Sequence, residues 1–252
     1  MNHKNDCKMI NENIRIDEGF NQREVVAYRF SKIFDEPFTN EALNEYSNGE
    51  WTSSLASGAD DMNHTDLIIK NKNAIYRCDC KTRSDGYCPN NKITEPSVLT
   101  IGEYAYNSRI TDFISFFGLD GNLYMCSLSN IRSMEPYEVK QSKGFNNHMQ
   151  NLYIFRVFDI MNDSSAIKIE VSEDFKKFYN NGYELYNKYR REIRRMTRLN
   201  DFYMIPGIVK TFERELREII HLYNSSLEKD KGSSIVMDDN LNDVCNILSS
   251  LN

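Results

Sequence analysis

The sequence predicts a mixed α/β chain of the α+β kind, in which a mixed central sheet is flanked by helices and followed by a mainly helical extension. Three patterns support this prediction: apolar residues recur at helical spacing over 17–34, short β-like runs follow over 66–171, and helical spacing then returns. We expect a polar N-terminal arm at 1–16, a core at 17–172 and a helical C-terminal module at 173–252.

Composition limits the classes of function. The 252 residues are enough to bury one large core, and the net charge of −6 gives no overall basic signature. Any binding of nucleic acid must therefore come from a local basic patch. The longest apolar runs are far shorter than the about 20 residues of a membrane-spanning helix, and the N-terminus carries no apolar signal segment. We expect no membrane association and a cytoplasmic location.

Six cysteines stand at positions 7, 78, 80, 88, 126 and 245, with a spacing too irregular for a small disulfide scaffold. We therefore expect reduced thiols in an intracellular protein. Cys78, Cys80 and Cys88 suggest zinc, but the segment has no CxxC pair and no fourth nearby ligand. Burial of Cys78 and Cys80 within a strand is the favoured interpretation, and the role of the three thiols stays open.

The other elements are predicted from periodicity and turn residues. Asp17 caps the first helix, and Pro37 lies just past its end. A DG-type turn at Leu119-Asp120-Gly121 separates two strands. Before the C-terminal helices we expect a short helix at 40–50, a hairpin over 66–76, a helix at 95–107, strands at 112–118 and 122–128, and a hairpin of 151–160 with 166–171. The C-terminal helices are expected at 175–196, 208–223 and 240–251.

Two carboxylates and a lysine are expected to meet at one end of the first hairpin. Asp66 begins its first apolar run, and the second run ends in Asp79-Cys80-Lys81. Alternate residues of a strand share a face, so Asp79 and Lys81 point the same way. If the runs pair across the KNKN turn at 70–73, Asp66 lies beside them. An ordinary surface ion pair at this position is the alternative interpretation.

Hydrolysis of a phosphodiester suits such a cluster. The reaction needs an activated water and charge neutralisation at the phosphate, which one or two Mg²⁺ ions held by carboxylates provide. Mg²⁺ prefers oxygen ligands and keeps several waters, so a few acids suffice. Lys81 would then orient the attacking water or offset phosphate charge. Glu24, within the first helix, is either a solvated acid or a third acidic group that reaches the cation.

These residues resemble the PD-(D/E)XK nuclease superfamily, which includes most type II restriction enzymes. In that core a helix bearing an acid precedes a hairpin that carries Asp and (D/E)xK, and the matching positions here are Glu24, Asp66 and Asp79-Cys80-Lys81. The resemblance is closest to the archaeal Holliday-junction resolvase branch, because Ser57-Gly58-Ala59 forms a small loop before the first acid and 79 − 66 = 13 residues separate the acids. It covers residues 17–130, and Thr65 replaces the proline of the motif.

The resemblance implies an enzyme with a restriction-endonuclease-like core and a metal cofactor. Asp66, Asp79 and Glu24 would bind Mg²⁺, for which Mn²⁺ can substitute, and Lys81 would complete the catalytic set. An enzyme that cuts both strands of double-stranded DNA needs two such sites, which implies a homodimer.

A basic stretch interrupts this acidic chain at 188–198, where KYRREIRRMTR holds six basic residues and one acid. On a helix its arginines spread over one broad side, and arginine contacts phosphates and guanine edges in bidentate fashion. The alternative is a solvated face paired with acids of the next helix, at Glu213, Glu215 and Glu218. The residues predicted to bind nucleic acid are Lys70 and Arg83 near the hairpin, and Arg190, Arg191, Arg194, Arg195 and Arg198 on the helix.

A Mg²⁺-dependent DNA endonuclease of restriction, homing or branched-DNA type is therefore the leading hypothesis from the sequence. Two alternatives stay open. One is a non-catalytic nucleic-acid-binding protein on a nuclease fold, and the other is a partner-gated defence nuclease that acts on DNA or RNA.

Overall fold

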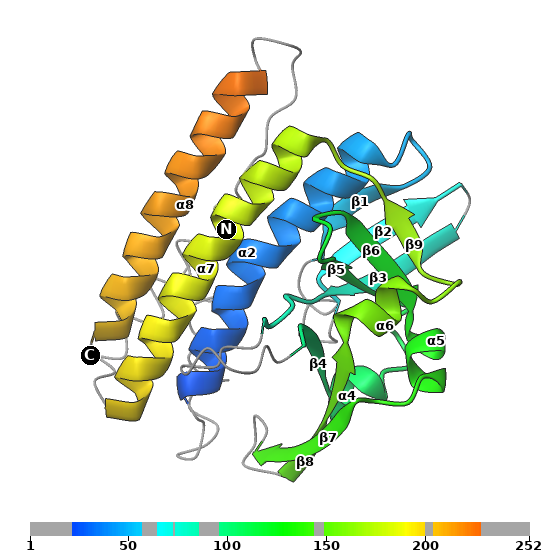
Figure 1. Ribbon diagram of the computed structural model, residues 1–252, viewed down its shortest axis with the longest axis horizontal. Helices are drawn as coiled ribbons and strands as arrows, with labels where there is room; N and C mark the ends of the chain where they lie inside the picture. The colour runs from blue at the N-terminus through cyan, green and yellow to red at the C-terminus, as the bar shows by residue number, and fades with distance from the viewer. Residues whose placement is uncertain are drawn as a thin grey trace, which may run out of the picture.

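The computed structural model describes residues 22–56, 65–72, 74–85, 96–143, 149–199 and 204–227. Within them the chain is mixed α/β, with a mixed sheet and long helices, which confirms the coarse fold class. Figure 1 shows three long helices side by side next to the main sheet, and a smaller sheet below it. The arm at 1–16, the loop at 57–64 and the helix expected at 240–251 lie outside the described residues.

The main sheet has six described strands in the order β1-β2-β3-β5-β6-β9. β3 and β5 are parallel, and the other neighbouring pairs are antiparallel. This arrangement puts the C-terminal end of β3 beside that of β5, in the middle of the sheet. The strands are β1 Thr52–Leu55, β2 Leu67–Asn71, β3 Ala74–Cys80, β5 Phe113–Phe117, β6 Leu123–Ser127 and β9 Ile167–Ile169.

A second, smaller sheet has three described strands in the order β4-β8-β7. Together with three short helices it covers the face of the main sheet that the long helices leave uncovered. Its strands are β4 Val98–Gly102, β7 Glu138–Lys143 and β8 Met149–Arg156, and the short helices are α4 Glu103–Tyr106, α5 Leu128–Ser133 and α6 Val157–Met161.

The main sheet is buried on both faces. On β5, Phe117 joins the core shared with the long helices, whereas Ile114 and Phe116 join the core shared with the small sheet. On β6, Met125 faces the helices and Cys126 faces the small sheet. Successive strand residues point to opposite faces, so a strand with two covered faces needs a nearly continuous apolar sequence.

The long helices pack on one face of the main sheet. They are α2 Gln22–Tyr46, α7 Glu173–Leu199 and α8 Ile205–Leu227, and the last two confirm the helices expected at 175–196 and 208–223. α2 contacts the sheet, α7 packs on α2, and α8 packs on α7 (Figure 1). A Cβ atom at Gly182 of α7 would lie 3.0 Å from the rings of Phe34 and Phe38, so this glycine permits the close approach of α7 to α2.

The hairpin of β2 and β3 has the expected antiparallel pairing, with Leu67 opposite Cys78. Lys72, in its turn, has a φ of 52°, in the left-handed region that tight hairpin turns use. Cys78 and Cys80 are buried in the core on the helix side. Because alternate strand residues share a face, Asp79 lies on the opposite face.

The boundary predicted at Pro37 is wrong. α2 continues through Pro37 to Tyr46, so it includes residues 40–46 of the short helix expected at 40–50, and the rest of that segment is a turn. Phe34, Phe38 and Leu43 are buried on one stripe that packs in the core on the helix side. Burial of this stripe compensates for the backbone hydrogen bond that the proline removes.

The helix predicted at 95–107 and the hairpin predicted over 151–171 are also wrong. Val98–Gly102 is strand β4, and only Glu103–Tyr106 is helical. β8 pairs with β4 and β7, while β9 pairs with β6, so the two segments of the expected hairpin belong to different sheets. Pairing with strands distant in sequence decided both outcomes, and the periodicity of one segment does not reveal such partners.

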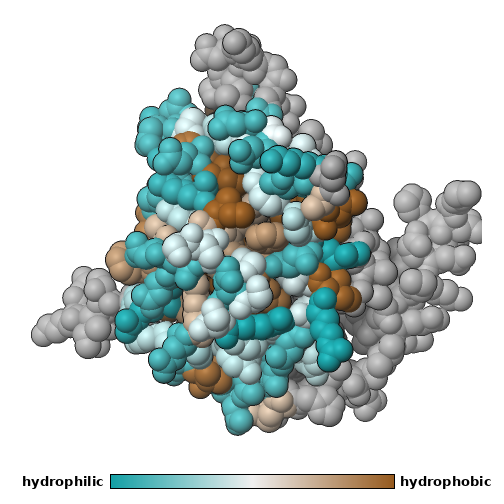
Figure 2. Space-filling model, turned by 90° about the vertical axis from the view of Figure 1, so that its right-hand side faces the viewer, coloured by the Kyte–Doolittle hydropathy of each residue, from teal (hydrophilic) through white to brown (hydrophobic). Residues whose placement is uncertain are grey.

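The described surface is mixed in polarity. No helix in the part of the chain that the structure describes is long and apolar enough to cross a membrane. On the face shown in Figure 2, hydrophobic residues form separate small patches among hydrophilic ones. Ile75, Phe158 and Leu222 are among the exposed apolar side chains, and single exposures of this kind are usual in folded proteins.

Candidate functional site

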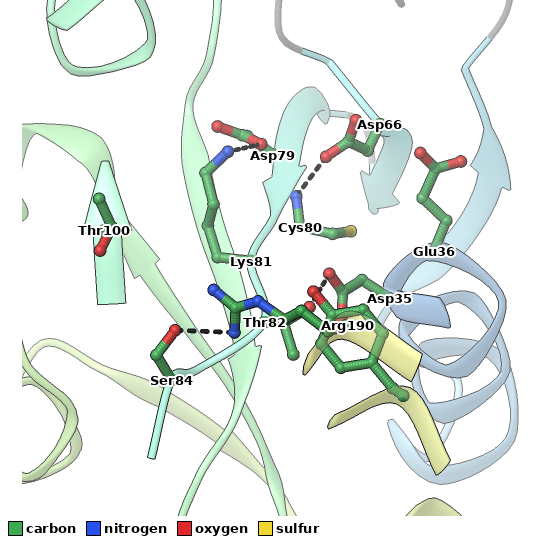
Figure 3. A pocket seen from close by; sticks show the side chains of 11 residues that line it. Asp35, Glu36, Asp66, Asp79, Cys80, Lys81, Thr82, Ser84, Thr100 and Arg190 are labelled. Carbon is green, nitrogen blue, oxygen red and sulfur yellow. Dashed lines mark hydrogen bonds and ion pairs between the residues drawn. The ribbon is translucent and has the colours of Figure 1, made fainter. Parts of the chain in front are cut away.

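A pocket opens at the end of the β2–β3 hairpin, between α2, α7 and β4 (Figure 3). Its cavity volume is about 220 Å³. Four of its lining side chains are carboxylates and two are cationic, so the pocket gathers opposite charges from segments far apart in the sequence. The lining residues are Asp35, Glu36, Asp66, Asp79, Cys80, Lys81, Thr82, Ser84, Thr100, Tyr186 and Arg190.

The structure brings Asp66, Asp79 and Lys81 together, as the hairpin predicts. Asp66 stands just before β2, where its backbone N–H donates to the carbonyl of Cys78 at 2.8 Å. Its Oδ2 accepts a hydrogen bond from the backbone N–H of Cys80 at 2.7 Å. At the end of β3, Nζ of Lys81 lies 2.6 Å from Oδ1 of Asp79, because residues two apart on a strand share a face. Backbone hydrogen bonds thus fix the first acid beside the second.

Asp79 has an unsatisfied carboxylate oxygen. The residue is 2% exposed, and its Oδ2 is buried without a hydrogen-bond donor among the described residues. Burial raises the pKa of Asp79 to about 7; Lys81 opposes this rise, and the carboxyl of Asp66 adds to it through charge and hydrogen bonding. Two carboxyl groups within hydrogen-bonding range, one with a buried oxygen that lacks a donor, require a shared proton or a cation.

Helix α2 supplies Asp35 and Glu36 to the pocket. Asp35 is 6% exposed and accepts a hydrogen bond from Thr82, and burial raises its pKa to about 7. Glu24 lies on the same helix, about 16 Å from Asp35 at 1.5 Å per residue, and its side chain is outside the described residues. The role expected for Glu24 stays a prediction. Asp35 and Glu36 are the acids of α2 that line the pocket beside the hairpin.

The sequence prediction misses Asp35 and Glu36 because it ends the first helix before Pro37. The signal that finds them is the pair Phe34 and Phe38, whose i and i+4 spacing continues the apolar stripe past the proline. Asp35 and Glu36 lie between these two aromatic residues, so they stand at the border of the core. A carboxylate at such a position is partly removed from water and can face a buried site.

The residues that follow β3 are tied to both neighbouring layers. Thr82 donates a hydrogen bond to Asp35 of α2. Ser84 exchanges two backbone hydrogen bonds with Val98, at the start of β4, at 2.8 and 2.9 Å. These contacts fix the direction in which the chain leaves β3, and they therefore help to hold Lys81 in the pocket.

Arg83 is a structural residue of the same segment. It is 7% exposed, and its Nη1 donates to the carbonyls of Phe117 and Gly118 at 3.1 and 2.6 Å. Its guanidinium also lies over the ring of Tyr183, 4.5 Å from the centroid, and Nε is 3.3 Å from Oδ1 of Asp85. Arg83 thus joins the exit of β3 to the end of β5, and this burial does not support the phosphate contact predicted for it.

The basic stretch lies within α7, and Arg190 lines the pocket. Its Nη1 donates to Oγ of Ser84 at 3.0 Å. Arg191 and Arg195 are exposed on the same helix, where the predicted contact with nucleic acid stays a prediction. The side chains outside the described residues are those of Arg194 and Arg198.

Two other charged positions lie away from the pocket. Lys70 is exposed on β2, four residues and about 13 Å along the strand from Asp66. Glu215 of α8 pairs with Lys188 at 3.4 Å and accepts a hydrogen bond from Tyr189 at 2.6 Å. The alternative interpretation, in which the basic face pairs with acids of the next helix, therefore holds for Lys188, the first residue of the basic stretch.

The pocket fits a cation that prefers oxygen ligands. Among the described residues, no group of three or more His, Cys, Asp or Glu side chains is arranged to hold a metal ion. Mg²⁺ needs fewer, because one or two carboxylates with several waters hold it in many proteins. Asp66 and Asp79 meet this need, since Oδ2 of Asp79 is buried beside Asp66 and lacks a described donor.

The cysteine side chains of β3 do not suit zinc. Cys78, Cys80 and Cys126 are buried and form no disulfide. Burial raises the pKa of the Cys80 thiol well above its usual range, and Cys78 adds to the rise. Zinc binds the thiolate, so a thiol kept protonated is a poor ligand. Burial of Cys78 and Cys80 within the strand is confirmed, and Cys88 lies outside the described residues.

Comparison with known proteins adds no relative. No protein-family model matches the chain, and neither the curated proteins nor the solved structures compared with it contain a match. The function proposed for this chain therefore depends on the geometry of its pocket.

Proposed function

We propose that the chain is a metal-dependent nuclease that hydrolyses phosphodiester bonds in DNA, with Mg²⁺ or Mn²⁺ as its cofactor. The observation that carries the proposal is the buried Oδ2 of Asp79, which has no donor among the described residues and lies in one pocket with Asp66 and Lys81. The order of the elements supports it. A helix that bears acids precedes an antiparallel hairpin, as in the nuclease core that the sequence resembles, whereas strand β4 and the short α4 stand where a helix was expected after the hairpin.

In the proposed site, Asp66 and Asp79 would hold the cation through their carboxylate oxygens, and the cation would offset the charge of the two neighbouring groups. Mg²⁺, when bound, activates water and stabilises charge at the phosphate. Lys81, held 2.6 Å from Asp79, orients the attacking water and offsets phosphate charge. Glu36, from α2, lines the same cavity (Figure 3). Its carboxylate would orient water beside the two aspartates.

The test is a panel of substrates: plasmid DNA, a four-way junction and RNA, each with Mg²⁺ or EDTA. We expect cleavage of DNA that requires Mg²⁺ and is lost in Asp79→Asn and in Lys81→Ala. Lys177→Ala is the matched control, because Lys177 is an exposed cation of α7 that pairs with Asp174 near the start of the helix.

Each other outcome of the panel has a definite reading. Cleavage that survives in both pocket variants would remove this pocket from the mechanism. Binding of DNA without cleavage of any substrate would favour the non-catalytic nucleic-acid-binding protein, and cleavage of RNA alone would favour the defence nuclease.

Double-stranded DNA is the proposed substrate, and a homodimer is the proposed assembly, because cutting both strands requires two pockets. Arg191 and Arg195 are exposed on α7, where they can contact backbone phosphates. Analytical ultracentrifugation of the active protein should show a dimer at the concentrations at which it linearises plasmid. A monomer that linearises plasmid in a single binding event would contradict this assembly.

A further inference from the structure

We propose that Arg190 of α7 binds a substrate phosphate inside the acidic pocket, so that α7 completes the site instead of only holding nucleic acid outside it. This inference deepens the proposed nuclease function and rests on it, because the ligand is the phosphate group next to the cation. The sequence placed Arg190 on a broad basic face, whereas the structure places it on the wall opposite the hairpin acids (Figure 3).

Aromatic packing fixes the rotation of α7 so that Arg190 meets the pocket. The ring of Tyr186 stacks on that of Phe34 with centroids 5.1 Å apart and an angle of 15°. Residues i and i+4 of a helix lie on one face, so Arg190 follows Tyr186 on the side that faces α2. Asp35 follows Phe34 directly, and Arg190 is close enough to Asp35 to lower the pKa of that carboxyl, which burial raises.

Arg190 is held by one hydrogen bond and keeps most of its donors. Nη1 donates to Oγ of Ser84 at 3.0 Å, and the guanidinium carbon lies 5.9 Å from the centroid of the Tyr186 ring. Among the described residues the structure shows no ion pair between Arg190 and a carboxylate. A guanidinium has five N–H donors in a planar fork, so this arrangement leaves a fork for a phosphate.

The contrast with Arg83 shows why Arg190 is the candidate. Arg83 is buried, and its donors are used by the carbonyls of Phe117 and Gly118 and by Asp85. Arg190 is only half-buried and opens into a cavity. A structural arginine donates most of its N–H groups to protein acceptors, whereas a ligand-binding arginine has N–H groups available for the ligand.

The size and charge of the pocket indicate which part of a nucleic acid enters. Its volume of about 220 Å³ is below the about 300–1,000 Å³ of sites that enclose a whole small molecule. A cavity of this size, lined by carboxylates and two cationic side chains, suits a phosphate group with its cation. Lys81 and Arg190 come from different walls of this cavity, and the two cations can neutralise one phosphate from two sides.

The experiment compares Arg190→Ala and Arg190→Lys with the control Lys177→Ala. The readouts are cleavage of a short labelled DNA duplex with Mg²⁺, and binding of inorganic phosphate by calorimetry. Loss of a charge-assisted contact of this kind lowers affinity or rate by about 10- to 100-fold, so we expect that loss in kcat/KM for Arg190→Ala. Arg190→Lys should restore part of it, because a point charge replaces the fork.

A second set of measurements separates binding from folding. Thermal unfolding of Arg190→Ala should stay near that of the wild type, since one hydrogen bond to Ser84 is lost. Ser84→Ala removes that hydrogen bond and keeps the arginine, so its thermal midpoint measures the structural cost of losing the bond alone. If Arg190→Ala does not fold, Arg190→Lys and Arg190→Gln carry the test through their phosphate affinity.

The outcomes distinguish this inference from the nuclease proposal. If Arg190→Ala cuts DNA and binds phosphate as the wild type does, while Asp79→Asn is inactive, the inference is overturned and the nuclease stands. Suppose that the wild type cuts no substrate but binds phosphate, and that Arg190→Ala loses this binding. The phosphate site then stands and the nuclease is overturned. Loss of both cleavage and phosphate binding in Arg190→Ala supports the two together.

Discussion

Two aspartates of the main sheet differ in how the protein satisfies their charge. Asp120, in the turn between β5 and β6, accepts hydrogen bonds from the side chains of Asn122 and Tyr124 at 2.7 and 3.0 Å. Lys168 of β9 adds an ion pair at 3.2 Å. Partial burial acts to raise the pKa of Asp120, but these hydrogen bonds outweigh it and lower the pKa.

Asp79 has the opposite surroundings. It is nearly fully buried, it faces the carboxyl of Asp66, and its Oδ2 has no donor among the described residues. Its pKa rises to about 7 although Lys81 lies 2.6 Å away. An acid surrounded by hydrogen-bond donors has a structural role, whereas an acid buried beside another acid favours binding of a proton or a cation.

The largest expected effect is on catalysis. Asp79→Asn should lower Mg²⁺-dependent cleavage by about 100-fold or more, because a metal ligand is lost while the shape of the side chain is kept. Asp120→Asn should leave the cleavage rate unchanged. Initial rates on plasmid DNA measure both, and equal losses in the two variants would erase the distinction between the two aspartates.

The same comparison applies to the two arginines, through stability. Arg83→Ala should lower the free energy of unfolding by about 3 kcal/mol, because the buried carbonyls of Phe117 and Gly118 lose their donor and Tyr183 loses its packing partner. Arg190→Ala should lower it by less than about 1 kcal/mol. Urea unfolding gives both values; an equal cost would assign Arg190 a structural role.

The raised pKa values predict how stability depends on pH without a divalent cation. Asp79 and Asp35 titrate near 7 in the folded chain and near 3.8 when unfolded, so folding favours their protonated forms. Their contribution is fully present below about pH 4 and is lost as pH rises toward 7. We expect Asp79→Asn to lose less stability than the wild type between pH 4 and 8, as measured by urea unfolding in EDTA at each pH.

Mg²⁺ should restore what this ionisation removes. The ion competes with the proton on Asp79, so its stabilisation should be larger at pH 8 than at pH 5. The shift of the thermal midpoint on adding Mg²⁺, compared between wild type and Asp79→Asn, measures this effect. A shift of equal size in the variant would place the cation elsewhere.

A smaller effect than that of Arg83→Ala is expected at Asp120. Asp120→Asn should lower the free energy of unfolding by about 1 kcal/mol, since part of its hydrogen-bond set survives with an amide oxygen. The sign of its pH dependence is opposite to that of Asp79: the lowered pKa gives stability that is present above the unfolded pKa and lost as pH falls. Urea unfolding of the wild type and of Asp120→Asn at pH 3 and pH 7 checks this. If the substitution lowered the free energy of unfolding more at pH 3 than at pH 7, the prediction would be wrong.

Patterns within single segments account for the elements that the sequence predicts correctly. The β2–β3 hairpin follows from two apolar runs and a polar turn, and the convergence of Asp66 with Asp79 and Lys81 follows from strand alternation. Gly121, with a φ of 76°, forms the turn between β5 and β6. The periodicity of α7 and α8 is strong enough to place both helices.

Contacts between distant segments decided the rest. Whether Pro37 ends a helix depends on how well Phe34 and Phe38 are buried by α7, and the choice of partner for β8 and β9 depends on strands elsewhere in the chain. Neither kind of information is present in the segment itself.

The sequence by itself determined that two aspartates and a lysine meet at the end of one hairpin, because residue spacing and strand geometry are local. Only the tertiary structure decided what stands opposite them. Asp35 enters from α2, and Arg190 enters from α7 to bond with a residue 106 positions away. Helix packing sets the rotation of both helices, and the stacking of Tyr186 on Phe34 selects which side chains face the pocket.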